Sequence, residues 1–134
     1  LRGMVEDASI DAIHMVGRLD SPDIAALLLE SDLFCLPTRS EGFSTSLLEA
    51  AACGTPSLVT DVGGARELMP DESYGFVMQK ADAGAFADVV RSIACGDRDL
   101  PTMGDRCIDR VEQQYSWKSV AQRLLEVIDD QRGV

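Results

Sequence analysis

Short apolar runs alternate with longer stretches in which apolar residues recur every three or four positions. The runs 33–36, 57–60 and 75–78 are typical of strands in a parallel sheet, because such strands are buried on both faces. A fourth run, Ile13–Val16, ends at Gly17 and predicts a further strand. Strands that alternate with helices predict an α/β fold with a doubly wound parallel sheet.

In the segments between and after these runs, apolar residues recur at the spacing of a helix. Ser21 is expected as an N-cap, with Pro22 at the first helical position, and this helix should end near Ser31. A short helical turn is expected over 66–69. Three longer helices are predicted over 82–95, 103–115 and 117–130, with residues 97–101 as a break between the first two. The C-terminal part of the chain is therefore helical.

The stretch from Glu41 to Pro56, EGFSTSLLEAAACGTP, contains the strongest candidate chemistry. Gly42 allows the backbone to turn and to approach a ligand closely. The small polar triplet Ser44, Thr45 and Ser46 predicts the start of a helix, because hydroxyl side chains accept hydrogen bonds from first-turn N–H groups. Free N–H groups and the positive end of the helix dipole form a site for phosphate. Capping and phosphate binding use the same groups, so both roles stay open for Ser44 and Thr45.

Two carboxylates flank this predicted helix start. Glu41 precedes the helix, and Glu49 lies in its second turn. Because carboxylates repel phosphate, we expect them to accept hydrogen bonds from hydroxyls on either side of it. A ligand that places phosphate between two groups of hydroxyls is a sugar nucleotide, so the pattern predicts a nucleotide-sugar site.

Composition and charge restrict the partners. The chain has 134 residues, enough for one domain with its own core. Its net charge of −11 argues against binding to a nucleic-acid backbone or to an anionic lipid surface, since both require clustered Lys and Arg. One anion held by backbone N–H groups remains compatible with this charge. No apolar run approaches the roughly 20 residues that span a membrane, and no signal-peptide pattern opens the chain.

The four cysteines contain no CxxC pair and are predicted to be buried, reduced thiols that bind no metal. This favours a cytoplasmic protein, and a parent protein at the periphery of a membrane stays compatible with it. The only histidine, His14, lies in the predicted first strand and is expected in the core or lining a pocket. Gly63 and Gly64 lack the GxGxxG spacing, so a tight turn is favoured over a second phosphate loop.

The Glu41–Pro56 stretch and its surroundings resemble a known family. EGFSTSLLEA, with DLFCLPTRS before it and CGTPSLVTDVGGARELM after it, is similar to the donor-site signature of retaining glycosyltransferases of glycosyltransferase family 4, the "glycosyl transferases group 1" proteins with the GT-B fold. The family's Glu-x7-Glu pattern falls on Glu41 and Glu49. The similarity extends from about Ile13 through the strand YGFVM to the helices around Tyr115–Trp117.

The resemblance implies a Rossmann-like domain that binds the donor of a hexosyl transfer from a nucleotide diphosphate sugar to an acceptor hydroxyl, without a metal or other cofactor. It implies that Glu41, Gly42, Phe43 and Ser44 contact the transferred sugar. The diphosphate would lie at Ser44, Thr45 and Ser46, and Glu49 would bind the ribose. Arg18 is placed where family members contact the base.

One departure from the family pattern concerns the cationic half of the donor site. Gly17-Arg18 resembles the strand end that a diphosphate-neutralising Lys follows in the family, but no matching Lys follows here. We therefore expect residues 1–134 to be a single partial domain, the C-terminal portion of a donor domain truncated on its N-terminal side. Acceptor binding would belong to an absent N-terminal domain, and the fragment alone is expected to be inactive.

Two other functions stay open at this point. A GT-B nucleotide-sugar epimerase would use the same donor frame, with an acid or base in the missing half. A non-catalytic α/β interaction module would instead bind a partner through the apolar C-terminal helices. Tyr115 and Trp117 in that region are expected to pack rather than to stack on a sugar.

Overall fold

The computed structural model describes residues 12–132, and a three-stranded parallel sheet forms the centre of the fold. The strands β1 (Phe34–Leu36), β2 (Ser57–Thr60) and β3 (Gly75–Met78) lie side by side in that order. Every residue of β2 is buried, because the strand has neighbours on both edges. The parallel sheet with flanking helices confirms the predicted α/β class.

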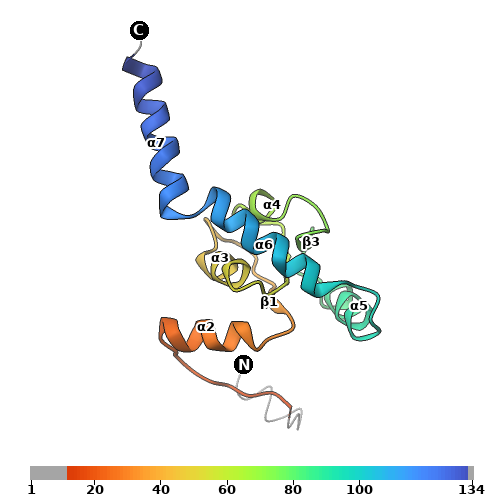
Figure 1. The fold of residues 1–134 in the computed structure, drawn as a ribbon. Helices are drawn as coiled ribbons and strands as arrows, with labels where there is room; N and C mark the ends of the chain where they lie inside the picture. Colours follow the sequence, from red (N-terminus) through yellow and green to blue (C-terminus); the bar gives the residue numbers. More distant parts are fainter. Residues whose placement is uncertain (1–11, 133–134) are drawn as a thin grey trace.

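Helices cover both faces of the sheet, and the last helix leaves it (Figure 1). Alternate residues of β2 divide the core: Val59 packs with one helical layer and Leu58 with the other. The helices of the described residues are α2 (Ser21–Leu29), α3 (Thr45–Ala52), α4 (Ala65–Leu68), α5 (Ala83–Ala94), α6 (Leu100–Gln114) and α7 (Trp117–Arg132). The layer around Val59 contains α3, α4 and the middle of α6, and the layer around Leu58 contains α5 and the start of α6.

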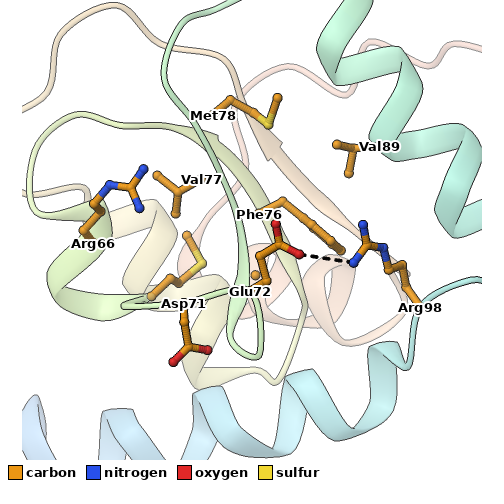
Figure 2. A pocket seen from close by; sticks show the side chains of 10 residues that line it. Arg66, Asp71, Glu72, Phe76, Val77, Met78, Val89 and Arg98 are labelled. Carbon is orange, nitrogen blue, oxygen red and sulfur yellow. Dashed lines mark hydrogen bonds and ion pairs between the residues drawn. The ribbon is translucent and has the colours of Figure 1, made fainter.

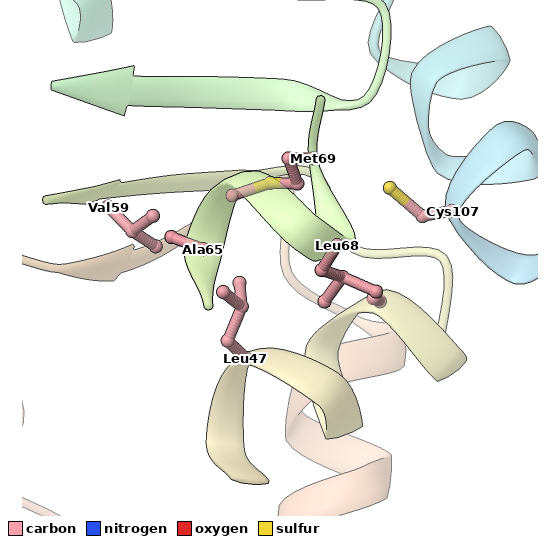
Figure 3. Packing of buried hydrophobic residues seen from close by; sticks show 7 residues of the cluster. Leu47, Val59, Ala65, Leu68, Met69 and Cys107 are labelled. Atoms are coloured by element: carbon pink, nitrogen blue, oxygen red, sulfur yellow. The ribbon is translucent and has the colours of Figure 1, made fainter. Parts of the chain in front are cut away.

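The main core cluster joins segments that are far apart in the sequence (Figure 3). Leu47 of α3 and Leu68 of α4 meet β2 from one side, and Cys107 of α6 closes the cluster. Each of these side chains is nearly inaccessible to solvent, so removing them from water contributes a large part of the folding free energy. This core fixes the position at which α3 begins.

The predicted first strand is wrong. Residues Ile13–Val16 form neither helix nor strand, and three of their apolar side chains are exposed. A strand of four residues is stable only when a neighbouring backbone accepts its hydrogen bonds, and no strand among residues 12–132 pairs with this run. His14 is consequently exposed rather than buried.

Two helix starts also differ from the prediction. The N-cap of α2 is Asp20 rather than Ser21, and its carboxylate accepts the N–H of Asp23 at 3.2 Å. Residues 97–101 are only partly a break, because Asp99 caps α6 and Pro101 lies in its first turn. Proline is compatible with that turn, because the N–H groups of the first turn have no acceptor within the helix and none is lost when proline lacks its own.

The cysteines are less buried than predicted. Cys107 is buried, Cys53 is half-buried, and Cys35 and Cys95 are exposed. Cys35 lies on β1, whose outer edge has no neighbour among the described strands, and Cys95 ends α5. Within residues 12–132, no helix is both long and apolar enough to cross a bilayer.

Candidate functional site

The site forms where the chain leaves β1 and enters α3. Parallel α/β sheets bind ligands beyond the carboxyl ends of their strands, and this loop lies at that end. Glu41, Gly42 and Phe43 form an exposed coil, and α3 starts two residues later at Thr45. The coil and the first residue of the helix are therefore both accessible to a ligand.

Ser44 is the N-cap of α3, as the hydroxyl triplet predicts. Its hydroxyl accepts the N–H of Leu47 at 3.3 Å and lies 3.1 Å from the hydroxyl of Ser46. The Ser44 side chain is only 7% exposed, so this hydroxyl belongs to the helix cap. The N–H groups of Thr45 and Ser46 have no acceptor within the helix and can meet an anion there.

Both candidate carboxylates are exposed. Glu41 lies in the coil before the helix, and Glu49 lies one turn inside α3, about 6 Å along the axis from Thr45. Neither forms an ion pair with a residue between 12 and 132. Their oxygens are therefore available to accept hydrogen bonds from ligand hydroxyls.

An apolar cavity lies next to Glu49. It has a volume of about 210 Å³ between α2 and α3, beside the open edge of β1. Its polar lining consists of Glu49, Ser46 and Ser31. Its apolar lining consists of Ile24, Leu27, Leu28, Leu33, Phe34 and Cys35. The sequence pattern missed this cavity, because its walls come from α2, α3 and β1, which meet only in the folded chain.

Arg18 does not line that cavity. It is exposed in the coil that leads to α2, three residues before the helix begins. Arg66, another basic residue near the site in sequence, pairs with Asp61 at 2.6 Å. The structure therefore brings Glu49 and Ser46 to the cavity but leaves Arg18 outside it.

The Gly63–Gly64 loop lies directly against the coil that contains Glu41. Both glycines have positive φ, +52° at Gly63 and +77° at Gly64, and they connect β2 to the four-residue helix α4. The tight-turn interpretation of these glycines is confirmed. The adjacent glycines predicted the turn from the sequence, but they did not predict its contact with the coil that contains Glu41.

A second cavity, of about 360 Å³, opens on β3 rather than on α3 (Figure 2). Phe76, Val77 and Met78 of β3 line it with Val89 of α5, and Arg98 lies at its side. The Arg98 guanidinium pairs with Glu72 at 3.3 Å and covers the Phe76 ring at 5.2 Å. Its cationic group is thus already occupied by protein partners.

Comparison with known proteins identifies relatives for most of the chain. The family model described as "Glycosyl transferases group 1" matches residues 1–107. The chain is 31% identical to an MMP alpha-(1->4)-mannosyltransferase of Mycolicibacterium hassiacum, over 89% of this chain and 29% of the relative. It is 34% identical to an N-acetyl-alpha-D-glucosaminyl L-malate synthase of Bacillus anthracis, over 84% of this chain and 29% of the relative.

Solved structures share the fold. A sucrose-phosphate synthase of Thermosynechococcus elongatus superposes with a TM-score of 0.85 at 25% identity, over 98% of this chain and 33% of the other. The C-terminal domain of a glycosyl transferase group 1 family protein of Francisella tularensis superposes with a TM-score of 0.74 at 21% identity, over 87% of this chain and 60% of the other. The sheet, its flanking helices and the helical C-terminus thus match GT-B glycosyltransferases. The chain spans less than a third of the length of the two curated relatives named above.

Proposed function

Because this chain belongs to the glycosyl transferases group 1 family, we propose that it is the donor-binding part of a retaining glycosyltransferase. The parent enzyme would transfer a hexosyl group from a nucleotide diphosphate sugar to an acceptor hydroxyl. The observation that supports this proposal is the start of α3, where first-turn N–H groups without a partner in the helix lie between the exposed carboxylates of Glu41 and Glu49.

Each part of the donor has a proposed position along this frame. Glu41 accepts hydrogen bonds from the sugar hydroxyls, and the backbone of Gly42, Phe43 and Ser44 lies beside the sugar. The N–H groups at Thr45 and Ser46 hold the diphosphate. Glu49 binds the ribose.

The nucleobase is bonded to the ribose, so we expect it to lie next to Glu49. The apolar cavity next to Glu49 has the character that a flat base requires, and Arg18 is proposed to contact the base from the coil before α2. Since Arg18 does not line the cavity, its contact would be with the outer edge of the base.

The reaction uses the start of α3 to stabilise negative charge. The bond between the anomeric carbon and the phosphate oxygen breaks, and its electron pair remains on the departing nucleotide diphosphate. The acceptor oxygen bonds to the anomeric carbon from the same face, and its proton passes to the departing phosphate. Preorganised N–H donors directed at this phosphate lower the barrier, each by roughly 3–4 kcal/mol in comparable sites. The scheme assigns no side-chain base and no metal.

Substitution of the two carboxylates in the parent enzyme tests the proposal. We expect Glu41→Ala and Glu49→Ala each to weaken donor binding about 10- to 100-fold, since each removes hydrogen bonds to a charged group. Glu112→Ala is the matched control, because Glu112 is exposed on α6. Donor affinity would be measured by titration with UDP- and GDP-sugars. Unchanged donor binding and transfer in both variants would refute the assignment.

The 134-residue chain itself offers a second measurement. Since no Lys follows Gly17-Arg18 to neutralise the diphosphate, we expect weak or undetectable binding of nucleotide sugars by calorimetry. Sub-micromolar affinity would contradict the proposal that this chain holds only part of the donor site.

A further inference from the structure

The coil from Glu41 to Phe43 has no regular secondary structure of its own, yet its backbone is in close contact with a second loop. A Cβ atom on Gly63 would lie 2.3 Å from the carbonyl oxygen of Gly42 and 2.7 Å from the Cβ of Glu41. Real Cβ atoms do not approach other atoms so closely, so only glycine fits at position 63. The loop after β2 therefore supports the backbone beside the Glu41 carboxylate.

Phe43 is held between two further residues. A Cβ atom on Gly64 would lie 2.8 Å from the Cδ2 of Phe43, so the ring covers that glycine. The centroid of the Phe43 ring lies 5.7 Å from that of Tyr115, with the ring planes inclined by 31°. This is a favourable distance for an aromatic pair. Phe43 is 42% exposed, so these contacts anchor a side chain that is otherwise open to solvent.

Tyr115 connects the coil to the core. It is the C-cap of α6, and its N–H donates to the carbonyl oxygen of Val111 at 2.9 Å. Its side chain is partly buried against the main core cluster, which includes Leu47 at the start of α3. Burial also raises the pKa of the Tyr115 hydroxyl above its ordinary value. The same core therefore positions both the helix start and, through Tyr115, the coil before it.

We propose that Tyr115 and the Gly63–Gly64 loop are positioning elements for the donor site: they hold the Glu41–Phe43 coil in a fixed place relative to the start of α3. The consequence for donor binding rests on the proposed function. The contacts themselves do not depend on it. Tyr115 lies 74 positions after Glu41 in the sequence, so only the folded chain brings it close to the coil. It touches no part of the donor in this scheme, since it acts through Phe43.

Backbone relaxation in the 134-residue chain tests the positioning directly. We expect the amide order parameter of Gly42 to fall from about 0.85 to below about 0.6 in Tyr115→Ala. Tyr115→Phe retains the ring and should keep the order parameter of the native chain. Tyr74→Ala is the matched control, because Tyr74 packs against the same core but stacks with Arg110 rather than with Phe43. An unchanged order parameter at Gly42 in Tyr115→Ala would overturn the proposal.

Phe43→Leu gives a second test if Tyr115→Ala unfolds the chain. Phe43 is not part of the core cluster, so this variant removes the aromatic pair while leaving that cluster unchanged. The order parameter of Gly42 should fall as in Tyr115→Ala, and a rigid Gly42 would overturn the proposal. If Tyr115→Ala does fold, the Phe43→Leu, Tyr115→Ala double variant should be no more mobile at Gly42 than either single variant, because the two rings act as one unit.

Kinetics of the parent enzyme separate this inference from the proposed function. Tyr115→Ala should raise the donor KM about fivefold with the acceptor KM unchanged, since an aromatic pair contributes about 1 kcal/mol beyond its burial and about 1.4 kcal/mol corresponds to tenfold. Tyr115→Phe should restore the donor KM. A mobile Gly42 with an unchanged donor KM would support the positioning contacts and contradict the donor site at Glu41.

Discussion

Ser44 shows how one residue contributes to the site through two different groups. Its hydroxyl is committed to the α3 cap, through the N–H of Leu47 and the hydroxyl of Ser46. Its backbone remains part of the surface at which we propose that the sugar and diphosphate bind. Capping and ligand binding therefore need not compete, because the hydroxyl accepts the N–H of Leu47 and leaves the N–H groups of Thr45 and Ser46 without a partner in the helix.

Cys107 is a single residue whose burial makes the stability of the fold depend on pH. Its thiol is 2% exposed and donates to the carbonyl oxygen of Tyr74 at 3.0 Å. Desolvation raises the pKa of this thiol from 9.0 to about 11. The folded state therefore favours the protonated thiol, and this contribution to stability is complete below pH 9 and is lost as the pH rises towards 11.

We predict that raising the pH from 9 to 11 lowers the free energy of unfolding of the native chain by more than it lowers that of a Cys107→Ala variant. The extra loss should amount to no more than about 3 kcal/mol in the free energy of unfolding between pH 9 and pH 11. Urea unfolding of both proteins at several pH values measures it. Parallel pH profiles for the two proteins would show that the thiol keeps its ordinary pKa in the fold.

At the scale of elements, the contact between α3 and α6 depends on two glycines. Gly54 ends α3 with a φ of +73°, and its N–H donates to Ala51 while that of Thr55 donates to Ala50. This pair of bonds is the Schellman motif. A Cβ on Gly104 of α6 would lie 2.2 Å from the Gly54 carbonyl oxygen, so the two backbones are in direct contact.

Gly104→Ala is expected to destabilise the fold by roughly 1–3 kcal/mol, because the methyl group would push α6 away from the end of α3. The gain in helix propensity, about 1 kcal/mol, is too small to offset this clash. Gly84→Ala on α5 is the control, since its nearest neighbour is a side-chain oxygen of the N-cap Asp82 at 3.2 Å, whereas the neighbour of Gly104 is a backbone oxygen at 2.2 Å. Urea denaturation compares the variants, and a stabilised Gly104→Ala protein would contradict the close contact.

At the scale of the whole molecule, α7 extends away from the body of the domain (Figure 1). Trp117 at its start is 89% exposed, so the prediction that this residue packs is wrong, whereas Tyr115 does pack. Further apolar side chains of the helix are exposed, among them Val120, Leu124, Leu125 and Val127. Their exposure means that α7 contributes little to the core of this chain.

We therefore predict that Leu124→Glu changes the free energy of unfolding of this chain by less than about 0.5 kcal/mol. Leu124 is 60% exposed, and the substitution removes few contacts. Leu68→Ala is the comparison, because Leu68 is 1% exposed and its truncation should cost roughly 2–5 kcal/mol. A loss of 2 kcal/mol or more in Leu124→Glu would show that α7 is packed against the domain in solution.

The sequence predicted those parts of the fold whose signals are local. The apolar runs of β2 and β3 and the hydroxyl cap at Ser44 appear where they were expected, because strand propensity and capping depend on a few adjacent residues. The run Ile13–Val16 carries the same local signal but forms no strand. The partner that a strand requires is a property of the sheet, and a pattern along one segment does not contain it.

The sequence by itself therefore determined the α/β class, the cap of α3 and the spacing of Glu41 and Glu49. Only the tertiary structure decided that Cys35 is exposed, that a cavity lies beside Glu49, and that Gly63 and Tyr115 support the coil before α3. Caps and periodicity arise from neighbours within a few residues. Burial and close contact arise from segments that the chain brings together from distant positions, and no local pattern records them.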